Sequence, residues 1–255
     1  MRHPKIHFIE WRLANSVVWW SNAPGEFGLN SRKSPELGLR EQHKFEKRQR
    51  IQAAVRMLFS RHGYETATLR QIAKRAHVGL GTLFNYAQDK RDLVFLIFNE
   101  ELAGVADEAL NAMQAEKRLL AKLLSLCRPH YVFFAKNPTL SRILLKDMTF
   151  YSDGKQAAEF HRIRGRLLSG IESTVRGAQQ LREIRSDEDA TLIARHIFLV
   201  FAGALRWWIA GRRPNPREGL ADLKRLFGLQ INGLHPSPGR GMNSPKRKRG
   251  SARPR

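Results

Sequence analysis

Apolar residues recur at helical spacing along most of the chain, beginning near Phe45. An α-helix brings positions three and four residues apart onto one face, so this spacing marks the buried side of each helix. No segment shows the alternation of apolar and polar residues that a half-buried β-strand requires. The pattern therefore predicts an all-α protein of about nine or ten helices. The first buried stripe consists of Ile51, Ala54, Val55, Leu58 and Phe59.

Breaks in this pattern divide the rest of the chain into long helices. Proline, glycine, serine and asparagine cluster between the apolar stretches, and these residues favour turns. Pro129 stands inside a helical stretch, where its missing N–H should kink the helix. The predicted long helices cover residues 89–113, 117–136, 138–150, 156–181, 188–211 and 217–231.

The segment 68–90 (TLRQIAKRAHVGLGTLFNYAQDK) contains two short helices in place of one long helix. Thr68 and Gln71 have the spacing of a capping box, in which each side chain bonds a free backbone N–H at a helix start. The first helix should end just before His77, and the second should run through Ala87. Asp89 then suits the N-cap of the long helix that follows.

Two short helices joined by a tight turn form the helix-turn-helix, whose second helix enters the DNA major groove. A plain helical hairpin is the commoner arrangement in all-α proteins and is the alternative. The second helix is too short to contribute much packing, however, and it directs Thr82, Asn85 and Tyr86 outward. Cations stand on both sides of it, where phosphates would run: Arg70, Lys74, Arg75, Lys90 and Arg91. We therefore favour DNA binding.

The charge balance agrees with a nucleic-acid partner. The chain has 45 Lys and Arg residues against 23 Asp and Glu, a formal net charge of +22. Such an excess points to nucleic acid or to an anionic membrane surface. Residues 239–255 carry seven of these cations and no acidic residue, and the remaining chain is still basic. We interpret the basic tail as a non-specific DNA tether.

The sequence does not indicate metal, disulfide or membrane chemistry. The single cysteine, Cys127, cannot form an intramolecular disulfide or a cysteine-based metal cluster. No catalytic pair stands at useful spacing, so no enzyme activity, no metal and no cofactor is predicted. The longest uncharged apolar run, residues 197–205, is far shorter than the ~20 residues of a membrane-spanning helix. We expect a cytoplasmic protein without a membrane partner.

Residues 47–100 resemble the N-terminal domain of the TetR (tetracycline-repressor-like) family of transcriptional regulators. The shared features occur in order, beginning with an alanine-rich first helix that ends near a phenylalanine. The match continues with Gly63-Tyr64, Thr68, Ile72-Ala73, Val78, Gly81-Thr82-Leu83, aromatic residues at 84 and 86, Asp89-Lys90 and Leu93. The C-terminal helices, with Trp207-Trp208 and LADLKRLF, resemble the helices through which the family dimerises.

Three positions depart from the family pattern. His77 stands where the family usually has glycine, and histidine tolerates the left-handed backbone conformation better than most residues. Phe84 replaces a frequent tyrosine, so it lacks a hydroxyl that could reach a phosphate. Ala87 replaces a phenylalanine that packs the recognition helix, and the gap could be filled by Phe45, Phe59 or Tyr64.

The resemblance implies roles for individual residues. Thr82, Tyr86 and Lys90 are expected to contact phosphates, which set the register of the protein on DNA. Leu80 and Asn85 are candidates for base contacts, because asparagine can bond an adenine through two hydrogen bonds and leucine can touch a thymine methyl. The remaining candidates are Gly79 and Gly81, which allow close backbone approach, and Thr68, Arg70 and Gln71 at the start of the preceding helix.

The resemblance also implies a ligand pocket and a dimer interface. An aromatic-rich middle section would hold an unknown small-molecule inducer, with Tyr131, Phe134, Phe150 and Phe160 as candidate lining residues, although core packing explains these aromatics equally well. Dimerisation is expected through helices 187–211 and 216–232. Trp207 and Trp208 point about 100° apart, so one should pack in the core and the other at a subunit interface. Phe198 and Phe201 complete the candidate interface.

The predicted organisation is a poorly structured extension (1–43), a helix-turn-helix domain (44–104), a helical ligand-binding and dimerisation domain (105–235) and a basic disordered tail (236–255). The predicted function is a bacterial, nucleoid-associated DNA-binding regulator, a homodimeric repressor released from a palindromic operator by its ligand. An all-α enzyme or ligand carrier would leave the 68–90 motif unexplained. A non-specific nucleic-acid coating protein would leave its ordered residues unused.

Overall fold

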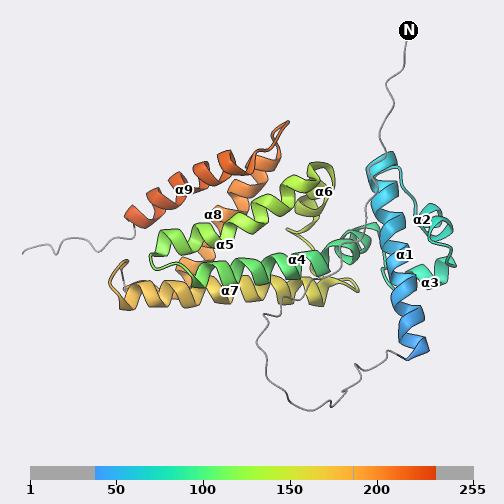
Figure 1. The fold of residues 1–255 in the computed structure, drawn as a ribbon, viewed down its shortest axis with the longest axis horizontal. Helices are drawn as coiled ribbons and strands as arrows, with labels where there is room; N and C mark the ends of the chain where they lie inside the picture. Colours follow the sequence, from blue (N-terminus) through green and yellow to red (C-terminus); the bar gives the residue numbers. More distant parts are fainter. Residues whose placement is uncertain (1–37, 186, 234–255) are drawn as a thin grey trace, which may run out of the picture. The chain divides into compact units, whose positions relative to one another are not determined.

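A computed structural model of the chain describes residues 38–185 and 187–233 (Figure 1). These residues form nine α-helices and no β-strand, which confirms the all-α prediction. Residues 1–37 of the predicted extension and the predicted tail, 236–255, lie outside the described residues. The helices are α1 (Leu39–His62), α2 (Leu69–Arg75), α3 (Leu80–Phe84), α4 (Lys90–Gln114), α5 (Leu119–Lys136), α6 (Pro138–Asp147), α7 (Ala157–Gln180), α8 (Ala190–Ile209) and α9 (Pro216–Gly233).

The first three helices pack around the predicted apolar stripe of α1, all five residues of which are buried. α1 ends at His62, where Gly63 adopts a φ of +84° and so supplies the left-handed residue that often terminates a helix. The helix begins at Leu39, six residues before Phe45. The predicted domain boundary at 43/44 therefore falls inside α1.

α4 begins at the helix-turn-helix region and extends without a break along the helices of the second region. Its N-cap is Asp89, as predicted, and the Asp89 carboxylate accepts a hydrogen bond from the Asp92 amide at 2.7 Å. Residues 93–98 are all buried, because α4 packs against α1 on one side and against α5 and α7 on others. The predicted boundary at 104/105 falls inside this helix, so one rigid element belongs to both regions.

The C-terminal helices pack around α4 and α5. α7 packs on α4 and α8, and α9 packs on α5 and α8. Within the described part of the chain, α8 is long and apolar enough to cross a membrane by length and composition, although residues 197–205 alone are too short. One side of α8 is buried against other helices and the helix contains Arg195 and Arg206, which is the pattern of a core helix in a globular protein.

Candidate nucleic-acid interface and ligand cavity

The connection between α2 and α3 is a tight turn held by backbone hydrogen bonds. α2 begins with the predicted capping box, in which Thr68 Oγ1 accepts from the Gln71 amide at 3.2 Å and Gln71 Oε1 accepts from the Thr68 amide at 2.9 Å. His77 adopts a φ of +53°, the left-handed conformation that its position demands. The Val78 amide then donates to the Ala73 carbonyl at 3.0 Å, which closes the turn just before α3.

α3 buries one face and presents the other. Leu83 is completely buried, whereas Asn85, the C-cap of α3, is exposed. The helix is shorter than predicted, since it ends at Phe84 and not near Ala87. The Tyr86 hydroxyl donates to the Lys44 carbonyl of α1 at 3.1 Å, which fixes the end of α3 against α1. The other candidates on this face are half-buried or exposed: Gly79, Leu80, Gly81 and Thr82.

Three more of the residues predicted to contact DNA have partners within the chain. Lys90 Nζ donates to the carbonyl oxygens of Tyr64 and Glu65, at 3.0 Å each, and lies 5.0 Å from the centre of the Tyr64 ring. Lys90 therefore holds the turn between α1 and α2, and one N–H remains for a phosphate. Thr68 and Gln71 bond each other at the start of α2, so their first role is to cap that helix.

The space beside Ala87 is not filled by Phe45. Ala87 is buried, but Phe45 is 55% exposed, so one of the three suggested replacements for the family's phenylalanine is excluded. Phe59 and Tyr64 pack edge to face with their ring centres 5.1 Å apart. Both thus belong to the packed part of the helix-turn-helix region.

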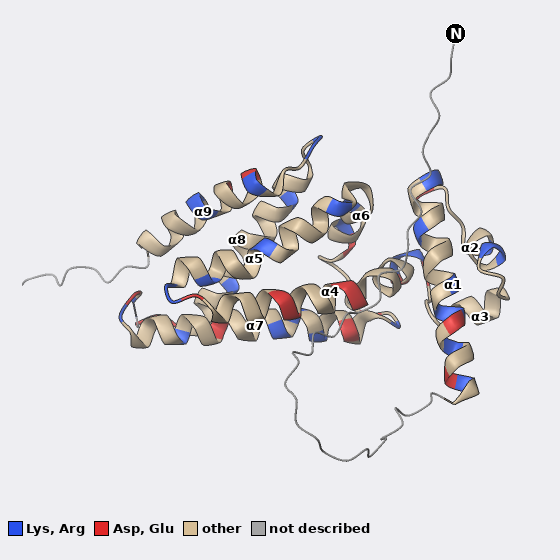
Figure 2. Ribbon diagram, viewed as in Figure 1, with Lys and Arg blue, Asp and Glu red and all other residues tan. Residues whose placement is uncertain are grey.

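Lys and Arg outnumber Asp and Glu along α1 and α2, the helices beside α3 (Figure 2). Residues 39–91 contain twelve Lys and Arg against four Asp and Glu, and α2 and α3 contain no acidic residue. Arg70, Lys74 and Arg75 of α2 are exposed, and in the described part of the chain none of them forms an ion pair. Their charges act on a phosphate over a screening length of about 8 Å at physiological salt.

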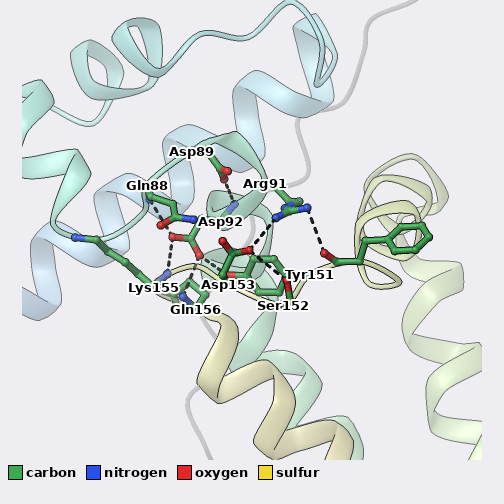
Figure 3. A network of polar contacts seen from close by, with 10 residues as sticks. Gln88, Asp89, Arg91, Asp92, Tyr151, Ser152, Asp153, Lys155 and Gln156 are labelled. Carbon is green, nitrogen blue, oxygen red and sulfur yellow. Dashed lines mark hydrogen bonds and ion pairs between the residues drawn. The ribbon is translucent and has the colours of Figure 1, made fainter.

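A buried carboxylate joins the start of α4 to the loop between α6 and α7 (Figure 3). Asp92 is 0% exposed. Its Oδ1 accepts from the Gln156 amide at 2.9 Å and from the Tyr151 hydroxyl, and its Oδ2 accepts from the Gln88 and Lys155 amides at 2.9 Å each. Burial, with the bond to Asp92, raises the pKa of Tyr151, which keeps its hydroxyl a donor. Four donors thus satisfy the Asp92 carboxylate.

Gln156, the residue before α7, connects this loop to the segment that follows α3. Its side-chain amide donates to the Tyr86 carbonyl at 2.9 Å, and its own carbonyl accepts from the Asn99 side chain at 3.0 Å. The loop requires glycine at Gly154, which has a φ of +141° and where a Cβ would lie 2.9 Å from Asp92 Oδ1. The start of α7 is therefore bonded to the residue that follows Asn85.

A cavity of about 500 Å³ lies among α4, α5, α6, α7 and α8, with mostly apolar walls. That volume is within the range of small-molecule sites in proteins. Two of the four aromatic residues predicted for the pocket, Phe134 and Phe160, line it. Tyr131 does not, because it is buried against Trp208, and neither does Phe150, which is 80% exposed. The family resemblance implies a pocket among these helices but does not specify which aromatic side chains face it.

Two arginines stand in the cavity wall. Arg206 donates to the Ala202 carbonyl at 3.1 Å and to the Thr149 hydroxyl at 3.0 Å, and burial lowers the pKa of Arg206. It remains a cation, because the arginine pKa lies far above neutrality. Arg164 lies over the Phe160 ring, 5.6 Å from its centre. Within the described residues neither arginine forms an ion pair with a carboxylate, so both can receive an anionic group.

His130 adds a neutral polar group to the same wall. It is buried, and its Nδ1 lies 3.0 Å from the Leu126 carbonyl. Burial lowers the pKa of His130 to about 4, against the smaller opposing effect of that hydrogen bond. At neutral pH the ring is therefore uncharged, and the positive charge of the cavity wall comes from Arg164 and Arg206.

The outer faces of α8 and α9 expose a set of large apolar side chains. Trp207 is 88% exposed, whereas Trp208 packs on Tyr131 with ring centres 4.7 Å apart, the division expected of adjacent tryptophans. Phe201 was a candidate for the interface, but it is buried and lines the cavity together with Phe198. The exposed set consists of Leu192, Leu199, Trp207, Leu226 and Leu229.

The described residues offer no cluster for a metal ion, and their one cysteine is buried. They contain no group of three or more histidine, cysteine, aspartate or glutamate side chains that could hold a metal ion. Cys127 is buried, and burial raises the pKa of its thiol well above the usual value. A buried, protonated thiol reacts slowly, which favours a packing role for Cys127.

Comparison with known proteins finds a family match over the helix-turn-helix region. Residues 51–97 match the family model described as bacterial regulatory proteins, tetR family. The HTH-type transcriptional regulator SAB2452 of Staphylococcus aureus is 39% identical over 57 residues, which cover 22% of this chain and 31% of that protein. The HTH-type transcriptional repressor KstR of Mycolicibacterium smegmatis is 27% identical over 177 residues, 69% of this chain and 82% of KstR.

The likeness in fold extends beyond that segment. The transcriptional regulator FadR from Bacillus subtilis, solved in complex with stearoyl-CoA, superposes with a TM-score of 0.58 at 19% identity. The superposition covers 73% of this chain and 99% of FadR. At that identity the comparison shows a shared fold, and the sequence comparisons supply the relationship in the DNA-binding region.

Proposed function

We propose that this chain, which belongs to the TetR family of bacterial transcriptional regulators, represses transcription as a homodimer that leaves a palindromic operator when a small ligand binds. DNA binding by the chain rests on its helix-turn-helix and on its relatives. Repression, dimerisation and ligand release are the parts that we propose.

One observation carries the proposal for operator recognition. α3 follows a turn closed by left-handed His77, and it projects exposed Asn85 and the half-buried Leu80 from a surface without acidic residues on α2 or α3. Asparagine and leucine are side chains that can read an adenine and a thymine methyl in the major groove. The cations of α2 are placed to bind the phosphates beside that groove.

The exposed faces of α8 and α9 support a homodimer. Isolated apolar residues are common on surfaces, but five large ones on two adjacent helices, among them a tryptophan that is 88% exposed, are typical of an interface. A twofold dimer would pair the same faces of the two copies. It would also place two recognition helices one DNA turn or a multiple apart, as a palindromic operator requires.

The cavity suggests the chemical class of the ligand. Its walls are mostly apolar, and Arg164 and Arg206 provide positive charge without a carboxylate partner. An apolar chain joined to an anionic group satisfies both features, because a carboxylate or phosphate can bond the two half-buried guanidinium groups. FadR, which shares the fold, was solved with stearoyl-CoA. We therefore propose a fatty acyl-CoA as the ligand, with its acyl chain among the apolar walls and its anionic part near the arginines.

α7 provides a route from the cavity to the DNA-binding surface. Phe160 lines the cavity and packs on Phe95, which stacks on Tyr151 with ring centres 3.6 Å apart. Tyr151 and Gln156 both bond Asp92, and Gln156 also bonds the Tyr86 carbonyl. A ligand that displaces Phe160 would move the start of α7 and thus the end of α3. Ligand binding then favours a dimer whose recognition helices are wrongly spaced for DNA.

The proposed operator recognition is tested by comparing two single substitutions. Asn85→Ala is expected to relax the base preference at one position of each half-site, because it removes a base contact and leaves the fold intact. Lys90→Ala is expected to weaken binding to every sequence alike, because it removes a charge and the bonds that hold the turn between α1 and α2. Selection of bound duplexes from a random pool, followed by sequencing, measures both. Unchanged preference in Asn85→Ala would contradict the proposed role of α3.

A further inference from the structure

We propose that the first three turns of α1, residues 39–50, form a second DNA-binding surface that grips the sugar-phosphate backbone beside α3. This inference rests on the proposed function, because it assigns a further contact to the same DNA. The stretch precedes residues 51–97, the part of the chain that matches the family model.

Residues 39–50 contribute almost nothing to the protein core. All of them are exposed except Arg48, which is half-buried, and even Phe45 is 55% exposed. A surface helix normally buries one apolar stripe, and the buried residues of α1 begin only at Ile51. Packing against the core therefore does not explain why α1 continues for three more turns.

The exposed turns carry cations on one face, next to the recognition helix. Arg40, Lys44 and Lys47 stand three to four residues apart, so they share a face of α1. That face and α3 enclose a groove of about 640 Å³, whose other lining residues are Glu41, His43, Thr82, Asn85 and Tyr86. Three of the candidate residues for DNA contact thus line one groove together with the cations of α1.

The position of α1 beside α3 is fixed by a hydrogen bond. The Tyr86 hydroxyl donates to the Lys44 backbone carbonyl, so the Lys44 side chain is not involved. In the described part of the chain Arg40, Lys44 and Lys47 form no ion pair, and Glu41 is the single acidic residue in the groove. The groove has a net positive charge and suits a chain of phosphates.

DNA phosphate is the partner that the geometry favours. A strand whose bases are read by Asn85 has its phosphates a short distance from that side chain, and Asn85 itself lines the groove. Twelve helical residues extend about 18 Å, enough to follow two or three phosphates on one strand. Such contacts carry no base information, so they raise affinity for all duplexes and leave base preference to α3.

The test compares two triple variants of the full chain. In Arg40→Ala/Lys44→Ala/Lys47→Ala the backbone bond to Tyr86 is kept, because it uses the Lys44 carbonyl. The control, Lys117→Ala/Arg118→Ala/Lys136→Ala, removes three exposed cations in and beside α5. Binding of selected and scrambled duplexes is measured by fluorescence anisotropy at several salt concentrations, with thermal unfolding as a check of folding.

We expect the α1 variant to bind both duplexes at least tenfold more weakly at low salt. Its salt dependence should be shallower by about 0.9 in log–log slope for each phosphate that the variant no longer neutralises, with the control unchanged. The ratio of selected to scrambled affinity should stay that of the wild type. A slope equal to that of the control would overturn the inference. If the wild type prefers no duplex, the proposed function fails, while the comparison of slopes still decides whether α1 binds DNA.

Discussion

Replacing Asp92 with alanine is expected to lower the free energy of unfolding by about 4 kcal/mol, because the substitution strands several buried donors. The Asp92 carboxylate is completely buried and accepts three backbone amides and the Tyr151 hydroxyl. Alanine would satisfy none of them. Urea unfolding followed by far-UV circular dichroism measures the change, provided that the m-value stays constant.

Two further variants distinguish the effect of losing this hydrogen-bond network from the effect of losing a surface charge. Asp107→Ala removes an exposed carboxylate that pairs with Arg166, and it should cost no more than about 1 kcal/mol. Tyr151→Phe removes one of the four donors to Asp92 and keeps the stacking on Phe95, so its cost should fall between the two. If Asp92→Ala were no more destabilising than Asp107→Ala, the carboxylate would not hold α4 to the loop before α7.

Introducing charge on the exposed face of α8 and α9 is expected to abolish operator binding by breaking the dimer. Trp207 and Leu229 are 88% and 73% exposed and neither lines the cavity, so Trp207→Glu/Leu229→Glu should leave the protomer folded. A monomer engages one half-site and forgoes the gain from binding two linked sites. The affinity for the operator should therefore fall at least ~100-fold.

The matched control is Phe150→Glu/Leu181→Glu, which changes an aromatic residue and a leucine that are 80% and 72% exposed on other elements. Analytical ultracentrifugation should show the control as a dimer and the Trp207→Glu/Leu229→Glu variant as a monomer. Dimers of the same stability in both variants would exclude this face as the subunit interface. Anisotropy titration with the selected duplex gives the accompanying change in affinity.

Features set by nearby residues could be predicted from the sequence. The capping box of Thr68 and Gln71, the left-handed His77 and the N-cap Asp89 each depend on backbone groups within a few residues, and all three are present. The apolar stripe of α1 follows from helical spacing, and the structure confirms it. The inward and outward positions of Trp208 and Trp207 follow from the turn of a helix.

Features that depend on contacts between distant segments were missed. Asp92 and Gln156 are bonded across 64 residues, and no local pattern indicates that these two residues pair. The position of Asp92 directly before a wholly apolar stretch does indicate that its carboxylate is buried. Lys90 is a residue type that often binds phosphate, yet two N–H groups of its side chain bond carbonyl oxygens in the turn after α1. The family resemblance implies a pocket in the helical domain that follows the helix-turn-helix, but which aromatic side chains face it depends on packing between distant segments, as Tyr131 and Phe150 illustrate.

The most direct test of the central claim is a titration of the wild-type protein with a selected and a scrambled duplex, each with and without stearoyl-CoA. We expect tighter binding to the selected duplex, and a loss of at least tenfold in that affinity when stearoyl-CoA is present. Arg206→Gln should keep the preference between duplexes and lose most of the response to ligand, because it removes a cation from the cavity wall. Equal affinity for both duplexes, unaffected by stearoyl-CoA, would contradict a ligand-released, sequence-specific repressor.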